Sequence, residues 1–184
     1  MKNKRSPNII QLLALFIILL ALFSSRIFQI KSKKEISIAD ETEIIAQASK
    51  ALENLDLPVG SLLLYSGSIL GTGYNTVNKD TNIAGHAEIN AINAAVKKIG
   101  LTQFNNLDRD KLILVTTFEP CEMCKGAIVH YNIKHVYFMK DKSPFHWNKK
   151  QLKMLRYEWN KRRIDGEELQ DSLFNLHPEY LKKK

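Results

Sequence analysis

The pattern of apolar and polar positions after residue 40 predicts a regular succession of helices and strands. Apolar residues recur at helical spacing over residues 44–54, behind Asp40 as a candidate N-cap. Two strand-like runs follow at 61–65 and 68–74, and the Ser66-Gly67 pair between them is typical of a hairpin turn. The first third of this region is therefore predicted to be a helix followed by a β-hairpin.

Helix and strand patterns then alternate. Residues 87–96 are apolar on most sides and end near Gly100, which predicts a buried helix. The unbroken apolar run within 111–116 is typical of a central strand covered on both faces. Residues 121–131 predict another helix and 136–139 another strand. This order predicts a layered α/β domain with a mixed central sheet.

The first thirty residues have a different pattern. From Ile9 to Phe23 every residue except Gln11 is apolar, after a cationic start. About 15 apolar residues match the core of a signal peptide, whereas an uncleaved anchor that extends toward Ile30 fits the same pattern. The cationic start favours an exported body. We therefore expect residues 1–30 to be a signal peptide or membrane anchor, and the protein to be membrane-anchored or exported.

The rest of the chain divides by composition. We expect a charged linker over 31–39, a core domain over 40–140 and a helical extension over 141–184. Within the extension, residues 149–163 place basic side chains on one helix face and apolar ones on a neighbouring face, which predicts an amphipathic helix. A solvated face, contact with a membrane surface and RNA binding all fit that helix.

The charge is distributed unevenly. Lys plus Arg number 27 against 19 Asp plus Glu, a net charge of +8, but residues 1–34 hold seven of the bases and no acid. The body is nearly neutral, so its charge gives no independent support for a nucleic-acid partner. The chain has only two cysteines, Cys121 and Cys124, too few for a disulfide framework. Their spacing indicates metal binding or redox chemistry.

Two short motifs carry the candidate chemistry. Cys121 and Cys124 follow Pro120, which we expect in the first turn of a helix, and their spacing places both thiols on one helix face. Together with His86 they would bind zinc through three ligands and leave the fourth tetrahedral position to water, as catalytic zinc sites do. Glu88, two residues beyond His86, is the candidate general acid and base. A redox-active cysteine pair is the alternative.

The combination of His-x-Glu with Pro-Cys-x-x-Cys resembles the signature of the zinc-dependent cytidine and deoxycytidylate deaminase superfamily. The resemblance covers roughly residues 40–140. It is greatest to the branch that contains guanine deaminases and bacterial tRNA-specific adenosine deaminases, through four segments: Pro58-Val59-Gly60, Gly73-Tyr74-Asn75, His86-Ala87-Glu88-Ile89 and Glu119 to Ala127.

This resemblance implies a cytidine-deaminase-like fold with helices on both faces of the sheet, one Zn²⁺ per chain and a homodimer. It also implies hydrolytic deamination of a nucleobase or nucleoside, of guanine or adenosine type, in which Asn75 and the backbone beside Ala87 contact the base. Gly85 departs from the alanine often found in these relatives. Three alternatives stay open: a tRNA adenosine deaminase if the body is cytosolic, a thiol oxidoreductase, and an inactive interaction module.

Overall fold

The computed structural model describes residues 13, 14, 16, 17, 37–142, 153, 155–162 and 167–176. The chain divides into two compact units, Met1–Phe138 and Met139–Lys184. The elements, in chain order, are α2 (Ile38–Leu52), β1 (Gly60–Tyr65), β2 (Ser68–Tyr74), α3 (Ala87–Ile99), α4 (Leu101–Asn105), β3 (Leu112–Phe118), α5 (Glu122–His130), β4 (His135–Lys140) and α7 (Glu167–Leu176). The finer division into leader, linker, core and extension stays a prediction.

The strands form one sheet in the order β2-β1-β3-β4. β1 is antiparallel to both of its neighbours. The turn between β1 and β2 has φ angles of 51° at Ser66 and 81° at Gly67, and two-residue hairpin turns favour such positive values. α5 lies in the connection between the neighbouring strands β3 and β4, which is the kind of crossover that joins parallel strands.

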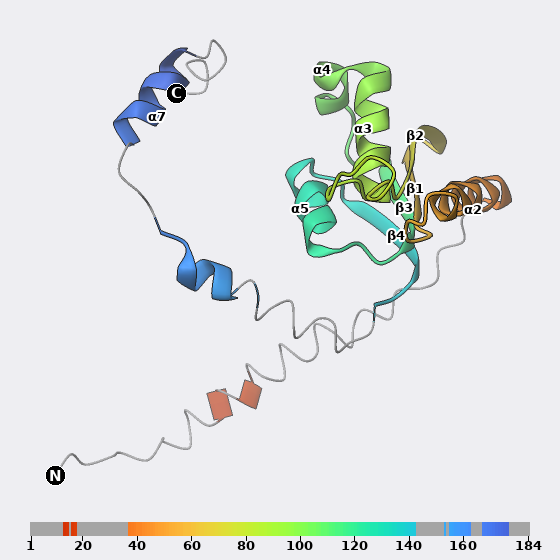
Figure 1. Cartoon of the computed structure of the whole chain (residues 1–184), viewed down its shortest axis with the longest axis horizontal. Helices are drawn as coiled ribbons and strands as arrows, with labels where there is room; N and C mark the ends of the chain where they lie inside the picture. Colours follow the sequence, from red (N-terminus) through yellow and green to blue (C-terminus); the bar gives the residue numbers. More distant parts are fainter. Residues whose placement is uncertain are drawn as a thin grey trace. The chain divides into compact units, whose positions relative to one another are not determined.

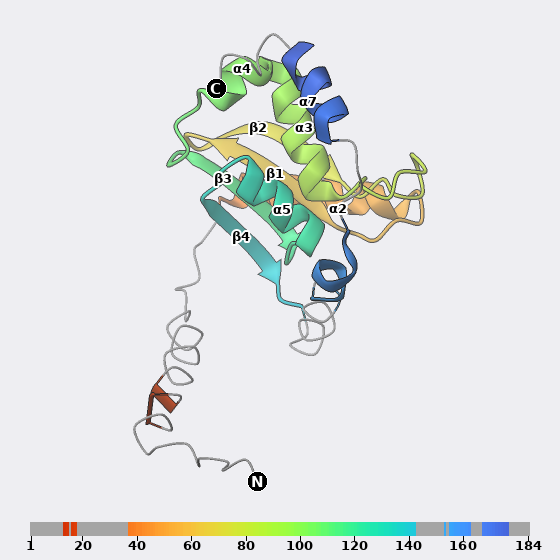
Figure 2. The same cartoon turned by 90° about the vertical axis from the view of Figure 1, so that its left-hand side faces the viewer.

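Helices cover both faces of this sheet (Figures 1 and 2). Residues 60–64 of β1 are all buried. Because successive side chains of a strand point in opposite directions, they pack alternately on the two faces of the sheet. Leu63 packs into a core cluster with Ile92 of α3 and Ile128 of α5, whereas Leu62 packs into a second cluster with Ile44 of α2. The sheet is therefore the middle layer between α2 and the pair α3 and α5.

Glycines bring the helices unusually close to the sheet. A Cβ atom at Gly73 would lie 2.3 Å from the carbonyl oxygen of Ala87 and 2.4 Å from the amide nitrogen of Ala91, both in α3. At Gly71 it would lie 2.4 Å from the Ala91 carbonyl oxygen. Because backbone atoms have no side-chain freedom with which to yield, these positions require glycine. β2 thus supports the first turns of α3, which carry the candidate site.

Two local predictions differ from the structure. The N-cap of α2 is Ser37 rather than Asp40: the Ser37 hydroxyl accepts a hydrogen bond from the Asp40 amide at 3.1 Å, and Asp40 lies in the first helical turn. The short helix α4 was not predicted. It begins after Gly100, whose φ of 83° ends α3, and it buries Phe104 completely in the core.

The predicted fold class also included an N-terminal membrane segment, and this part is corrected. Among the residues that the structure describes, no helix combines the length and the apolar character needed to cross a bilayer. The expected membrane-anchored or exported location rested on that segment and is corrected with it. Apart from residues 13, 14, 16 and 17, the segment 1–30 lies outside the described residues.

The C-terminal unit is described by itself. Residues 155–160 are helical, within the predicted amphipathic helix, and Leu155 and Trp159 are 66% and 80% exposed. α7 has Leu173 and Leu176 exposed. The aromatic residues 145–147 lie outside the described residues.

Candidate metal centre

The predicted zinc ligands lie at the starts of two helices. His86 is the N-cap of α3 and Cys121 is the N-cap of α5, while Cys124 lies in the first turn of α5. Pro120 precedes the N-cap, so its predicted place inside the first turn is wrong by two positions. At the start of α5 the amides of Cys124 and Met123 hydrogen-bond to the Cys121 sulfur. The positive end of a helix dipole also favours anionic groups such as thiolates at a helix start.

The ligand atoms of these three residues converge on one point. Cys121 Sγ lies 3.5 Å from His86 Nδ1 and 3.5 Å from Cys124 Sγ, and Cys124 Sγ lies 3.6 Å from His86 Nδ1. A tetrahedral zinc ion, with bonds of about 2.3 Å to sulfur and about 2.0 Å to nitrogen, would separate its ligand atoms by roughly 3.5 to 3.8 Å. The three side chains therefore fit zinc and form a candidate zinc site.

The two thiols differ in their tendency to ionise. The hydrogen bond between the two thiols, whose sulfur atoms lie 3.5 Å apart, lowers the pKa of Cys121 to about 4. The pKa of Cys124 is raised, first by that same hydrogen bond and then by burial. Cysteine binds zinc as the thiolate, so binding of the ion would release the protons that the two sulfur atoms carry.

Glu88 lies beside this centre. The side chain belongs to the first turn of α3 and is only 3% exposed. Its Oε2 accepts a hydrogen bond from Cys124 Sγ at 3.4 Å. Burial raises the pKa of Glu88 above the usual value for a glutamate. A carboxyl group with a raised pKa can both accept and return a proton near neutral pH, as a general acid and base must.

Asn75 and Ala87 are brought together as well. Asn75 follows β2 and is buried, and its Oδ1 accepts a hydrogen bond from the Ala87 amide at 2.9 Å. The Ala87 amide is therefore occupied by Asn75 in this structure, and Asn75 Oδ1 is used by this bond. The substrate-binding roles of Asn75 and Ala87 stay predictions.

Sequence reasoning missed two residues that frame Asn75. Asn90 Nδ2 donates to the Tyr74 carbonyl oxygen at 2.8 Å and to the Thr76 hydroxyl at 3.0 Å. The Thr76 amide donates to the Gly85 carbonyl oxygen at 2.7 Å. A Cβ atom at Gly85 would lie 2.8 Å from the Thr76 hydroxyl, so the departure from alanine at this position accommodates Thr76. The glycine at position 85 was the only feature of the sequence that pointed to this network.

Comparison with known proteins adds independent evidence. A model of the cytidine and deoxycytidylate deaminase zinc-binding region matches residues 39–140, which include every predicted site residue. The tRNA-specific adenosine deaminase of Buchnera aphidicola is 37% identical over 100 residues, which are 52% of this chain and 63% of that protein. The tRNA-specific adenosine deaminase of Streptococcus pyogenes serotype M18 is 35% identical over 96 residues, 52% of this chain and 57% of that protein. The chain thus covers less than two thirds of the length of either relative.

A similar solved structure is the guanine deaminase from Bacillus subtilis. It has a TM-score of 0.50 and 25% sequence identity, over 68% of this chain and 78% of the other. The zinc cofactor predicted from the sequence is confirmed by the family match and by the convergence of the three ligands.

Proposed function

Because the chain belongs to the family of cytidine and deoxycytidylate deaminases, as its sequence predicts, we propose that it is a hydrolase that removes an amino group from a nucleobase or nucleoside. The carbon–nitrogen bond that breaks is that of a cyclic amidine, and the amine leaves as ammonia. The observation that carries the proposal is the convergence of His86, Cys121 and Cys124 beside the buried carboxyl group of Glu88.

Each residue has a separate task in this proposal. His86, Cys121 and Cys124 hold the metal. A zinc ion bound there would supply a water molecule activated for attack on the ring carbon that carries the amine. Glu88 accepts one proton from the attacking water and delivers it to a ring nitrogen. As the carbon–nitrogen bond breaks, Glu88 takes the second proton from the oxygen now bonded to the ring carbon and delivers it to the amine, which leaves as ammonia. Asn75 orients the ring through its side-chain amide group, which its bond to Ala87 holds in place.

We further propose a purine substrate, of guanine or adenosine type. The tRNA-specific adenosine deaminases and the guanine deaminase described above support this choice over cytosine. The sequence relatives also favour a second candidate, adenosine within tRNA. The homodimer implied by the resemblance is part of the proposal, and light scattering of the purified chain tests it.

Ammonia release tests the function directly. The full chain, purified with zinc, is assayed against guanine, adenine, cytosine, their nucleosides and tRNA. Activity on free guanine or adenosine supports the first candidate, and activity on tRNA alone supports the second. No release from any of these substrates contradicts the proposal.

A pair of variants assigns the proton transfer. Glu88→Gln keeps the size of the side chain but removes the base, so we expect turnover to fall by at least about 100-fold with zinc still bound. Glu41→Gln, at an exposed carboxylate of α2, is the matched control and should change neither the turnover nor the bound zinc. Residual turnover close to that of the wild type in Glu88→Gln would refute the role of Glu88.

A further inference from the structure

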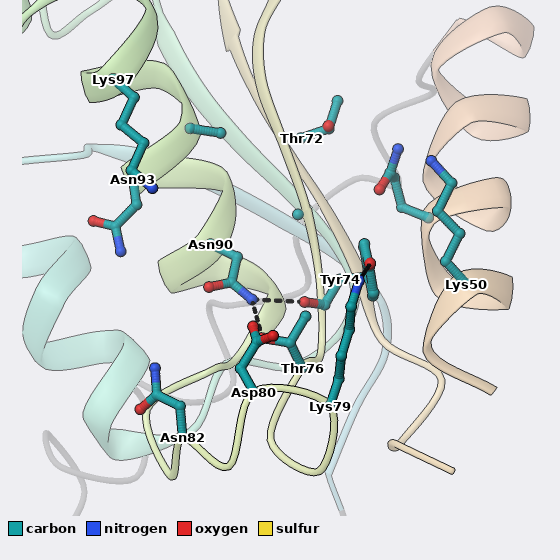
Figure 3. Close-up of a pocket in the computed structure, with 13 residues that line it drawn as sticks. Lys50, Thr72, Tyr74, Thr76, Lys79, Asp80, Asn82, Asn90, Asn93 and Lys97 are labelled. Carbon is teal, nitrogen blue, oxygen red and sulfur yellow. Dashed lines mark hydrogen bonds between the residues drawn. The ribbon is translucent and has the colours of Figure 1, made fainter. Parts of the chain in front are cut away.

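One side-chain amide group joins the end of β2 to α3 on both sides of Asn75. Asn90 Nδ2 donates one hydrogen bond to the Tyr74 carbonyl oxygen at 2.8 Å and another to the Thr76 hydroxyl at 3.0 Å (Figure 3). A side-chain amide has two N–H donors, and these two partners use both. The segment 74–76 is therefore attached to α3 immediately before and immediately after Asn75.

The same residue is connected to the start of α3. The Asn90 amide donates to the His86 carbonyl oxygen at 2.9 Å, which places the Asn90 side chain one turn beyond the N-cap. Asn75 Oδ1 in turn accepts from the Ala87 amide at 2.9 Å, and the Thr76 amide binds the Gly85 carbonyl oxygen. These bonds close a ring of contacts in which the segment around Asn75 is held against the first turn of α3.

We propose that Asn90 is a positioning residue that sets the place of Asn75 relative to the start of α3 and thereby sets the affinity for the substrate ring. The part of this proposal that concerns the substrate rests on the proposed function, in which Asn75 contacts the ring. Asn90 bonds to the zinc ligand residues only through the His86 backbone, so its side chain acts on binding and leaves the metal and Glu88 in place.

Asn93 provides a matched control, because it lines the same pocket as Asn90. This polar pocket, of about 580 Å³, is lined by residues of α2, β2, α3 and the segment after β2 (Figure 3). Asn93 lies in it one turn after Asn90, on the same helix, but its side chain is exposed and makes no hydrogen bond among the residues that the structure describes. The same substitution at position 90 or 93 therefore makes the same change in helix propensity and in charge. Only the substitution at position 90 also removes hydrogen bonds to segment 74–76.

The test compares Asn90→Asp and Asn90→Ala with Asn93→Asp and Asn93→Ala in the full, zinc-loaded chain. Aspartate has the shape of asparagine but cannot donate. Loss of the positioning bonds is expected to raise the KM for guanine or adenosine about 10-fold. We expect kcat to stay within about 2-fold of the wild-type value and zinc to stay at one ion per chain. The lost contact would bind the substrate equally well before and during the reaction, whereas the zinc ligands and Glu88 are unchanged.

Hydrogen exchange provides a readout that needs no substrate. If Asn90 holds Asn75, the Ala87 amide should exchange about 3- to 10-fold faster in both Asn90 variants, because its bond to Asn75 Oδ1 is weakened, and at the wild-type rate in both Asn93 variants. Unchanged Ala87 exchange in the Asn90 variants would overturn the proposal, as would a joint loss of zinc and kcat or an equal effect at Asn93. Absence of turnover in the wild type would refute the proposed function alone, since the exchange measurement still decides the role of Asn90.

Discussion

Replacing Gly73 with alanine tests whether the candidate site depends on the close approach of β2 to α3. The added Cβ atom would lie 2.3 Å from the Ala87 carbonyl oxygen and 2.4 Å from the Ala91 amide nitrogen. Ordinary contacts lie between 3.4 and 4 Å, so β2 and the first turns of α3 must separate by roughly 1 Å. His86 and Glu88 stand at that end of the helix and move with it.

The loss in the free energy of unfolding depends on which atoms collide. Overpacking of a core costs about 1–3 kcal/mol, and backbone atoms in contact favour the upper end of that range. A loss of about 3 kcal/mol corresponds to a fall of about 6–12 °C in the midpoint of thermal unfolding for a chain of this size. Because α3 shifts relative to α5, which carries both cysteines, we also expect weaker zinc binding.

Thermal unfolding and zinc titration of the full chain measure these two effects. Gly126→Ala is the control, since Gly126 is an exposed residue in the middle of α5 with no atom within 4 Å of an added Cβ. Alanine in a helix is favoured over glycine by about 0.5–1 kcal/mol, so this variant should be slightly more stable than the wild type. If Gly73→Ala unfolds at the wild-type temperature and binds zinc equally well, the close approach does not constrain the site.

Three further predictions concern the metal, a buried carboxylate and an ion pair. Removal of zinc with a chelator should lower the unfolding midpoint, and restoring zinc to 100 times its dissociation constant should regain about 2.7 kcal/mol in calorimetry. Asp56 is buried and accepts hydrogen bonds from the amides of Asn78 and Lys79 at 2.8 and 3.3 Å, so Asp56→Ala should cost about 2 kcal/mol in urea unfolding and Asp56→Asn less; equal losses would contradict the role of the two bonds. Lys134 Nζ lies 2.7 Å from Asp110 Oδ1 and lowers the pKa of Asp110 below its usual value. The stabilisation is therefore present at neutral pH and is lost as the pH falls through that lowered pKa, so Lys134→Ala should reduce stability at pH 7 and make no difference in strong acid.

The parts of the fold and site with local signals could be predicted from the sequence. The Ser66-Gly67 turn is located correctly because a two-residue turn between apolar runs depends on its own residues alone. The three zinc ligands and Glu88 were found because their chemistry restricts residue type at fixed spacing, and the structure brings them together.

The remaining features depend on contacts that short stretches of sequence do not contain. Asp40 and Ser37 are both good N-cap residues, and only the backbone geometry decides between them. Asn90 has an ordinary polar position on a helix, and its function as a support of segment 74–76 exists only once β2 has docked on α3. Pro120 was expected in the first turn because proline suits that position, but Cys121 takes the N-cap and the helix begins at Glu122.

The tip of the β1–β2 hairpin is a suitable site for labels and insertions. This tip, Ser66-Gly67, is exposed, and the seven residues of β2 separate it from Asn75 by roughly 20 Å at the usual rise of a strand. Exposed tips of this kind tolerate insertions well. A fluorophore, an affinity tag or new chain termini placed there would leave the zinc-binding end of the sheet undisturbed.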